Sequence, residues 1–198
     1  AYSIEAALDS KCFDKVIVST DDAEIADIAI KYGAEVPFIR PANIADDYAT
    51  TLDVIKHAIE FTESQNWVVK NVCCIYATAP FLTPEFIKKG LQELTKSTID
   101  YAFSATSFPF PIQRAIRLNE QERVEMLQPE HLNTRSQDLE EAYHDAGQFY
   151  WGTATAFLKG KPFFSPQSKA ILLPRKRVQD IDTPEDWELA EALYKALQ

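Results

Sequence analysis

The stretch NVCCIYATAP, residues 71–80, is a continuous apolar run that ends in small and polar residues. A run that is apolar on both faces predicts a central parallel strand covered by helices on either side. The residues TAPFLTP follow, and Pro84 suits the first turn of a helix that we expect to end near Lys96. A buried strand followed directly by a helix is the basic unit of an α/β fold.

The same alternation continues on both sides of this unit. Asp21 and Asp22 can cap one helix, and Thr50 or Thr51 can cap the next. The pattern predicts the α/β class, with a Rossmann-like, mostly parallel sheet and flanking helices. We expect further strands at residues 16–20, 35–39 and 101–105, and further helices over residues 1–10, 23–32 and from 51 onward.

The alternation of strands and helices stops near Ser107. FPFPIQ contains two prolines, and RAIRL and RVEML flank NEQE as a plausible β-hairpin. We therefore expect an α/β domain of residues 1–106 and 149–198, with an inserted lobe, 107–148, that covers a site or pairs two subunits. AILLP and VQDID are the predicted later strands. Pro184 opens a last helix with four partly buried residues, Trp187, Leu189, Ala190 and Leu193.

The composition limits the partners and the compartment. The chain has 198 residues, with 20 Lys and Arg, 30 Asp and Glu, and a formal net charge of −10. This charge repels a phosphate backbone, so nucleic acid is not an expected partner, although a local basic cluster can still hold one small anion. The three cysteines lack metal-ligand spacing and predict reduced thiols in the cytoplasm. No apolar run approaches about 20 residues, so no membrane span is expected.

Polar residues at the carboxyl ends of predicted strands are the candidates for chemistry, because open parallel sheets bind ligands there. Asp180 and Asp182, at i and i+2 of a strand, would share one face, where a cation such as Mg²⁺ can offset their repulsion. Alternatively, Asp182 or Thr183 caps the helix opened by Pro184, and both readings can hold together. No complete glycine-rich nucleotide motif supports a Rossmann dinucleotide site or a P-loop.

Several arginines lie beside aromatic and proline residues in this acidic chain, a setting that favours capture of a carboxylate or phosphate. Ordinary surface ion pairing is the alternative for each of them. His144 and Asp145 suggest an acid–base pair, but neighbours in sequence need not face one another. The arginines are Arg40, Arg114, Arg117, Arg123 and Arg135.

Eight stretches spread over the chain resemble the pseudaminic acid cytidylyltransferases and, more widely, the N-acylneuraminate cytidylyltransferases. The combination of YATAPFL with RSQDL and YHDAGQFYWG is the most specific, and it favours the pseudaminate branch over the sialate branch. The stretches are AYSIEAAL (1–8), VIVSTDDAEIA (16–26), YGAEVPFIRPANIADD (32–47), CCIYATAPFL (73–82), FSAT (103–106), FPFPIQRA (108–115), RSQDLEEAYHDAGQFYWG (135–152) and DIDTPEDWELAE (180–191).

The resemblance implies an enzyme that transfers CMP from CTP to a nonulosonic acid, an acidic nine-carbon sugar, with release of pyrophosphate and with Mg²⁺ as cofactor. Asp180 and Asp182 then match the catalytic metal ligands. The family's cytosine-binding positions fall on Arg40, Ala49 and Thr51. It also implies a homodimer in which the lobe, 107–148, is exchanged between subunits. The sugar-binding positions fall on Tyr76, Arg114, Arg135, His144, Tyr150, Phe163 and Phe164.

One departure from the family concerns the phosphate loop. Members of the family begin with a strand and an Arg/Gly/Ser/Lys-rich loop that holds the CTP phosphates, and the match here begins after that segment. We therefore expect the printed chain to be inactive by itself and predict function for the intact protein. Within the same chemistry, N-acetylneuraminate or another nonulosonate is the alternative substrate. A non-catalytic nucleotide-binding protein is the alternative from a different class.

Overall fold

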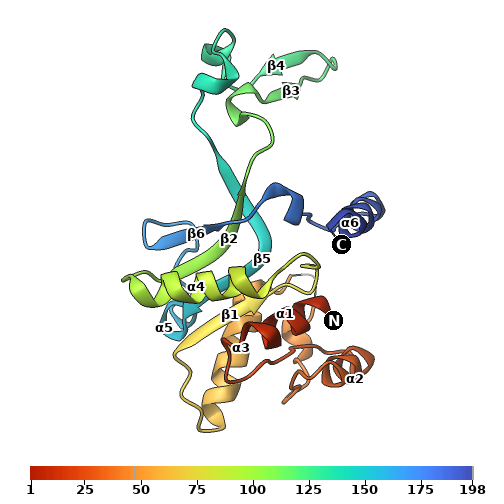
Figure 1. The fold of residues 1–198 in the computed structure, drawn as a ribbon, viewed down its shortest axis with the longest axis vertical. Coiled ribbons are helices and arrows are strands. Elements are labelled where there is room, and N and C mark those ends of the chain that lie inside the picture. Colours follow the sequence, from red (N-terminus) through yellow and green to blue (C-terminus); the bar gives the residue numbers. More distant parts are fainter. Residues whose placement is uncertain (47, 198) are drawn as a thin grey trace.

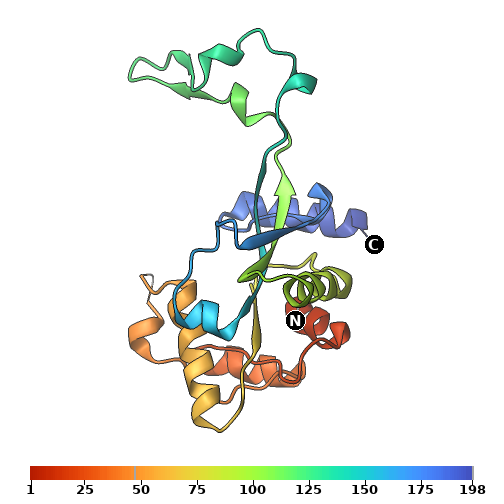
Figure 2. The same ribbon diagram turned by 90° about the vertical axis from the view of Figure 1, so that its left-hand side faces the viewer.

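The computed structural model describes residues 1–46 and 48–197. Figures 1 and 2 show an α/β body and a small lobe that stands away from it on two extended segments. The sheet of the body has four strands in the order β1 (Asn71–Ile75), β5 (Tyr143–Thr153), β2 (Tyr101–Ser107) and β6 (Ser168–Leu172). β5 is antiparallel to both of its neighbours, whereas β2 and β6 are parallel. Three of the four strands therefore run in one direction, which confirms the α/β class with a mostly parallel sheet.

The strand order differs from the expectation for residues 71–75. Among the described residues, β1 pairs only with β5, so it lies at one end of the sheet and not at its centre. The central position next to β1 belongs to β5, a strand that the sequence pattern did not predict. The predicted strands at 16–20 and 35–39 reduce to one parallel bridge between Ile17 and Glu35. The predicted strand at VQDID is irregular chain.

The helices begin where their capping residues predict. Asp22 accepts a hydrogen bond from the backbone N–H of Ile25 at 2.8 Å, and Thr50 forms a capping box with Asp53. Pro84 is the first residue of its helix, as expected. The α-helices are α1 (Tyr2–Ser10), α2 (Ala23–Lys31), α3 (Thr51–Ser64), α4 (Pro84–Lys96), α5 (Ala154–Leu158) and α6 (Pro184–Leu197).

Helices cover both faces of the sheet (Figure 2). On one face, α4 places Ile87 against Phe149 and Trp151 in a buried cluster. On the other, Ile55 and Ile59 of α3 pack with Phe157 of α5 and with a tyrosine of β2, Tyr101. Burying such side chains stabilises the body by about 1.5 to 3 kcal/mol for each fully buried one. These two buried clusters, one on each face of the sheet, hold the strands in place and so position the strand ends that carry the candidate site.

The last helix begins at Pro184 as predicted, but its exposed face is more apolar than expected. Trp187 is 59% exposed and Leu189 is 50% exposed, so of the four residues named only Ala190 is buried and Leu193 partly buried. Thr183 and Asp186 cap this helix reciprocally: the Thr183 N–H donates to Asp186 Oδ2 at 2.9 Å. The Asp186 N–H donates to Thr183 Oγ1 at 3.3 Å. The capping alternative for this segment is therefore confirmed, with Thr183 as the cap.

The lobe contains the predicted hairpin, formed by β3 (Ile116–Leu118) and β4 (Val124–Met126). Because Ser107 still pairs with Tyr143, the segment that leaves the sheet is 108–142, and the predicted range 107–148 includes the start of β5. Short 3₁₀ turns complete the described structure: Ala42–Ile44, Ile112–Arg114, Pro129–His131, Ser136–Asp138 and Arg175–Arg177. The lobe exposes apolar side chains, with Phe110 at 80% and Leu118 at 64%.

Candidate active site

An aromatic cluster lies on the α3 side of the sheet, where β1 ends. Tyr76 follows β1 directly, Tyr150 lies in β5, and Phe163 lies in the loop after α5. The ring centroids of Tyr76 and Tyr150 are 5.4 Å apart, and those of Tyr150 and Phe163 are 5.3 Å apart. Phe103 of β2 stacks beneath Tyr150 at 6.2 Å. Separations in this range are favourable for aromatic pairs, so the cluster forms a firm apolar wall that carries phenol hydroxyls.

The N-terminus of α3 connects the predicted nucleotide positions to this wall. Thr51 Oγ1 lies 3.0 Å from the hydroxyl of Tyr76. The backbone N–H of Ala49, two residues before the first residue of α3, donates to Asp46 Oδ1 at 2.9 Å. Thr51, a predicted cytosine-binding position, and Tyr76, a predicted sugar-binding position, are thus direct neighbours.

Arg40 lies in the polar loop that precedes α3. Its Nη2 donates to Asp21 Oδ1 at 3.3 Å, and its side chain is 25% exposed. The Nε atom is buried and has no hydrogen-bond partner among the described residues. A buried guanidinium N–H without a partner is costly, so Arg40 retains donor capacity for a ligand with acceptor atoms.

A β-bulge shapes β5 next to the aromatic wall. Phe103 pairs with Tyr150, but Ala105 pairs with Asp145, so four residues of β5 lie opposite Ser104 alone. Ser104 is fully buried, and its hydroxyl accepts the backbone N–H groups of Gln148 and Phe149, both at 3.1 Å. Bulges of this kind redirect side chains and are frequent beside active sites.

The bulge brings Asp145 back onto Tyr150. The Tyr150 hydroxyl donates to Asp145 Oδ2 at 2.5 Å. The backbone N–H of Gly147 donates to Asp145 Oδ1 at 2.9 Å, and Gly147 has φ of +60°, a conformation that favours glycine. Burial, followed by the hydrogen bond to Asp145, raises the pKa of Tyr150 well above its ordinary value. The phenol is therefore neutral at every physiological pH.

Asp180 and Asp182 lie in the loop between a 3₁₀ turn and α6, so the strand geometry predicted for them is wrong. Both are exposed. Asp180 faces the bulge, because a Cβ built at Gly147 would lie 3.8 Å from Asp180 Oδ1. The backbone N–H of Asp182 donates to Asp186 Oδ2 at 3.3 Å. Among the described residues, no cluster of three or more His, Cys, Asp or Glu side chains could hold a metal ion.

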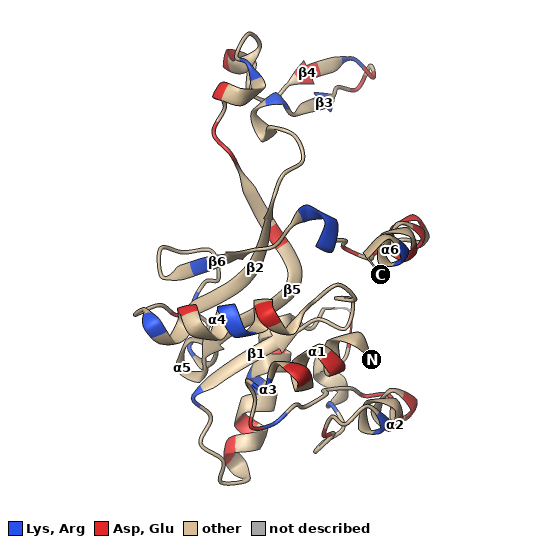
Figure 3. Cartoon of the chain, in the orientation of Figure 1, with Lys and Arg blue, Asp and Glu red and all other residues tan. Residues whose placement is uncertain are grey.

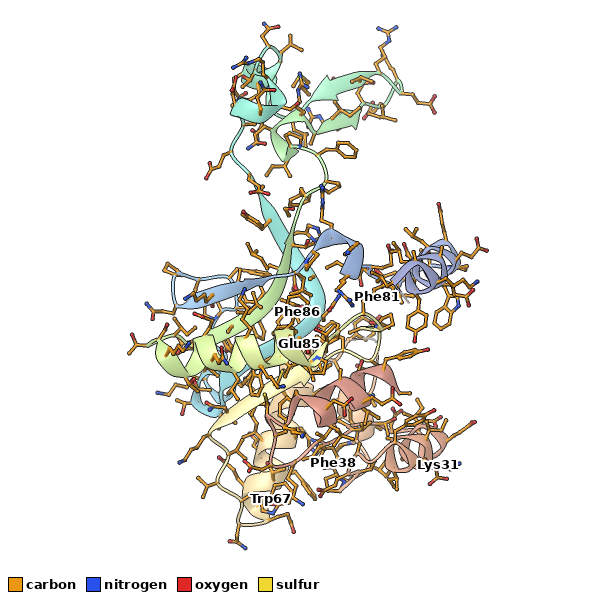
Figure 4. All side chains as sticks on the ribbon, in the orientation of Figure 1. Lys31, Phe38, Trp67, Phe81, Glu85 and Phe86 are labelled. Atoms are coloured by element: carbon orange, nitrogen blue, oxygen red, sulfur yellow. The ribbon has the colours of Figure 1, made fainter. Side chains whose placement is uncertain are left out.

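Remote contacts hold this acidic loop in place. The side-chain amide of Gln148, in the bulge, donates to the carbonyl oxygen of Arg177 at 2.5 Å. Arg177 in turn donates from Nη1 to the carbonyl oxygen of Phe81 at 3.5 Å, and Phe81 lies between α4 and α6 (Figure 4). Figure 3 shows the basic turn Arg175–Arg177 as a blue segment of the chain between β6 and α6. A basic turn therefore lies three residues before the first carboxylate of the acidic pair.

Two predicted sugar-binding arginines lie far from the wall within one chain. Arg114 and Arg135 belong to the lobe, at the opposite end of the extended stem (Figure 1). The side chain of Arg135 is 71% exposed and pairs with Asp138 through Nε at 2.7 Å. Arg114 donates to Ser136 Oγ at 3.2 Å. A single chain therefore does not bring these two arginines together with Tyr150.

The remaining predicted positions flank the wall. His144 lies at the start of β5, where its Nδ1 is 2.7 Å from the carbonyl oxygen of Asp145. Its ring is 4.7 Å from that of Phe108, at the base of the lobe. Phe164 is 72% exposed, and its ring lies 5.5 Å from that of Phe103.

The family model for cytidylyltransferases matches residues 1–195. The chain belongs to the cytidylyltransferase family. Two relatives, both pseudaminic acid cytidylyltransferases from Campylobacter jejuni strains, are 48% identical over 195 residues, which is 98% of this chain and 84% of theirs. A CMP-N,N'-diacetyllegionaminic acid synthase from Legionella pneumophila is 33% identical and covers all of this chain and 85% of its own.

Solved structures of a synthetase and a synthase share the fold. A CMP:2-keto-3-deoxy-manno-octonic acid synthetase, solved in complex with CTP, has a TM-score of 0.67 at 12% identity, over 100% of this chain and 87% of its own. A 4-diphosphocytidyl-2C-methyl-D-erythritol synthase from Anaerococcus prevotii has a TM-score of 0.62 at 16% identity, over 98% and 89%. At such identities the likeness concerns the fold alone, and the Rossmann-like class is confirmed by it. No helix among the described residues is long and apolar enough to cross a membrane.

Proposed function

We propose that this member of the cytidylyltransferase family transfers CMP from CTP to pseudaminic acid and releases pyrophosphate. The observation that carries the proposal is the identity of 48%, over nearly the whole chain, to pseudaminic acid cytidylyltransferases. In this reaction the anomeric hydroxyl of the sugar forms the new bond to the α-phosphorus, and the bond between the α- and β-phosphates breaks. The sugar hydroxyl loses its proton, and pyrophosphate carries away the electron pair of the broken bond.

The site residues divide into a nucleotide half and a sugar half. Arg40, whose buried Nε has no hydrogen-bond partner within the described part of the chain, would bind the cytosine and its ribose together with Ala49 and Thr51 at the start of α3. The aromatic wall would receive the sugar, with Phe163 and Phe164 against its acyl groups. Because Thr51 contacts Tyr76, the two substrates would meet at this contact.

Mg²⁺ is the cofactor that we propose for the acidic loop. Asp180 and Asp182 would hold it, because Mg²⁺ binds through one or two carboxylates and completes its coordination with water and substrate phosphates. The two carboxylates are exposed, and among the described residues they belong to no cluster of three or more His, Cys, Asp or Glu side chains, which fits this preference. The ion would supply charge stabilisation for the departing pyrophosphate. The hydrogen bonds of Gln148 and Arg177 hold the loop that carries Asp180 and Asp182 beside the bulge.

We also propose a homodimer in which each lobe completes the site of the partner subunit. The support is the exposed apolar surface of the lobe and the separation of Arg114 and Arg135 from the wall of their own chain. In the partner's site these arginines would pair with the sugar carboxylate, the contact for which guanidinium geometry is suited.

The free cysteines Cys12, Cys73 and Cys74 support a reducing compartment, the cytoplasm.

The test is turnover by the full-length gene product. Pyrophosphate release and CMP-sugar formation are measured with CTP and Mg²⁺ and with each of three sugars: pseudaminic acid, N,N'-diacetyllegionaminic acid and N-acetylneuraminic acid. The proposal expects the highest kcat/KM with pseudaminic acid. Equal or better use of either other sugar would reject the substrate assignment, and no CMP-sugar with any of the three would reject the function.

A further inference from the structure

We propose that Asp145 is a positioning residue that fixes the hydrogen-bond direction of Tyr150, so that Tyr150 binds a hydroxyl or amide N–H of the sugar and never its carboxylate. The inference rests on the proposed function and names the substrate group that this part of the wall recognises. The sequence suggested Asp145 only as an acid–base partner of His144, but His144 Nδ1 contacts the backbone carbonyl oxygen of Asp145 and the Asp145 carboxylate contacts Tyr150 instead. The likeness to known proteins assigns Asp145 no role. The geometry of the bulge carries the argument.

The bulge makes the contact between Asp145 and Tyr150 possible. In a regular strand, residues five positions apart are separated by about 16 Å, at about 3.3 Å for each residue, and their side chains cannot meet. Here the hydroxyl of Tyr150 lies 2.5 Å from Asp145 Oδ2. The buried hydroxyl of Ser104 holds the intervening chain by accepting two backbone N–H groups. The contact is thus built into the sheet.

The hydrogen-bond inventory of the pair sets its direction. A phenol has one hydrogen, which Tyr150 donates to Asp145, so its oxygen can only accept from any further partner. The other carboxylate oxygen, Oδ1, accepts from the N–H of Gly147. Both oxygens of Asp145 are therefore engaged by β5 itself, and the carboxylate cannot turn away from the phenol without leaving a buried donor unpaired.

The surroundings make this direction matter. Tyr150 is only 6% exposed and lies among the rings of Tyr76, Phe103 and Phe163. Little solvent reaches such a position, so water cannot bridge the Tyr150 oxygen and a second acceptor atom brought by a ligand. A sugar carboxylate at this position would meet a phenol that can only accept and a negatively charged Asp145 behind it. A hydroxyl or amide N–H would instead find the acceptor it needs.

The same arrangement gives the site selectivity. A site built to hydrogen-bond a substrate OH or NH rejects an analogue that lacks this group strongly, because the buried polar group then remains unpaired. Nonulosonic acids carry several hydroxyl and acylamino groups beside one carboxylate. The sugar would therefore be oriented with its carboxylate toward the arginines and a donor group toward Tyr150.

The experiment uses the full-length gene product and three variants. Asp145→Asn should reverse the direction of the bond, because the asparagine oxygen remains on the Gly147 N–H and its NH₂ group faces Tyr150. Tyr150→Phe removes the acceptor. Tyr143→Phe is the matched control, since the Tyr143 hydroxyl donates to Glu141 Oε2 at 2.8 Å on the exposed part of the same strand. The kcat and the KM values for sugar and CTP are measured for each, together with the melting temperature.

We expect Asp145→Asn and Tyr150→Phe each to raise the sugar KM about tenfold or more, as for loss of one buried hydrogen bond, and to change the CTP KM less than twofold. The double variant should be no worse than Tyr150→Phe alone, because Asp145 acts only through Tyr150. Tyr143→Phe should match the unchanged protein. Two results would overturn the inference while leaving the proposed function intact. One is a sugar KM within twofold of normal in the single variants. The other is a double variant whose fold-change in sugar KM equals the product of the two single fold-changes. Absence of turnover by the unchanged protein would overturn both.

Discussion

Gly90 of α4 lies against Trp151 of β5 with no room for a side chain: a Cβ built at Gly90 would be 2.5 Å from Trp151 Cδ1. Trp151 is 2% exposed, and its indole N–H donates to the carbonyl oxygen of Ile87 at 2.9 Å. The indole therefore cannot move aside without losing a buried hydrogen bond. The absence of a side chain at Gly90 sets the distance between α4 and the sheet.

Gly90→Ala should therefore destabilise the protein, although alanine favours a helix over glycine by about 1 kcal/mol. Overpacking of a rigid core costs about 1 to 3 kcal/mol or more, and here the contact is with a buried ring. We expect a net loss of about 2 kcal/mol in the free energy of unfolding, measured by urea denaturation. Gln92→Ala, on the exposed side of the same helix, is the control and should change it by less than about 0.5 kcal/mol. An equal or higher stability of Gly90→Ala would contradict the close packing of Gly90 on Trp151.

Ser104→Ala should destabilise the bulge in β5. The substitution leaves the N–H groups of Gln148 and Phe149 without an acceptor in a fully buried place. Each unpaired buried donor costs about 1 to 3 kcal/mol, so we expect a loss of at least about 2 kcal/mol. Ser64→Ala, which removes an exposed hydroxyl, is the control. Because the bulge positions Asp145, the variant should also bind the sugar more weakly. If the Ser104→Ala protein is destabilised but has a normal sugar KM, the bulge does not position the sugar-binding residues.

Local signals in the sequence predicted the helices well. Asp22 and Thr50 each begin a helix through a hydrogen bond with the residue three positions ahead, and Pro84 begins one because its ring fixes φ near the helical value. Such local features are visible in a short window of sequence. Thr51, Tyr76 and Tyr150, which the family resemblance places in the site, lie next to one another in the structure, and their binding roles stay a prediction.

Long-range pairing explains what the sequence did not reveal. The aromatic stretch FYW in residues 149–151 has high strand propensity, but its antiparallel place beside β1 depends on partners about which the pattern says nothing. The bulge depends on Ser104, 44 residues from Gln148. The acidic loop is held by Arg177 and Phe81, 96 residues apart. No periodic pattern could have placed Asp145 on Tyr150, because a bulge interrupts the period.

The thiols of β1 should be chemically inert in the folded protein. Cys73 and Cys74 point to opposite faces of the strand, into different apolar clusters. Burial raises the pKa of Cys74 to about 12 and that of Cys73 well above its ordinary value. The thiolate is the reactive form, so at pH 8 both should react with a disulfide reagent only after unfolding in guanidinium. Both cysteines are partly buried, and rapid reaction of either thiol in the native protein would contradict the raised pKa values.

The same shift predicts how stability depends on pH. The folded pKa of Cys74 lies above the ordinary thiol value of about 8.5, so its contribution to stability is complete below that pH. The contribution is lost as the pH rises from about 8.5 toward 12. As the pH rises over this range, the free energy of unfolding should therefore fall less for Cys74→Ala than for the unchanged protein. Urea denaturation at several pH values measures this difference. An identical pH dependence would argue against the shift.

Asp182→Asn tests the proposed metal site. A metal that stabilises the departing pyrophosphate acts mainly in the transition state, so kcat at saturating Mg²⁺ should fall more than about tenfold while the CTP KM changes little. Chelation of Mg²⁺ should abolish turnover of the unchanged protein. Asp27→Asn, on the exposed face of α2, is the control for the loss of one surface charge. Normal turnover of Asp182→Asn would remove this residue from the site.

Subunit mixing tests whether the lobe serves the partner's site. Arg135→Ala removes a guanidinium from the lobe, and Tyr150→Phe removes a hydroxyl from the wall, so each variant alone should be impaired with the sugar. If Arg135 reaches the partner's Tyr150, a mixed dimer of the two variants contains one fully intact site and one doubly altered site. Random mixing makes about half of the dimers mixed, so about a quarter of normal activity should return when the two are refolded together. If each lobe serves its own chain, every site in a mixed dimer is altered and no activity returns. Mixing Arg135→Ala with Arg114→Ala is the control: both changes lie in the lobe, so no intact site forms and no recovery is expected under exchange.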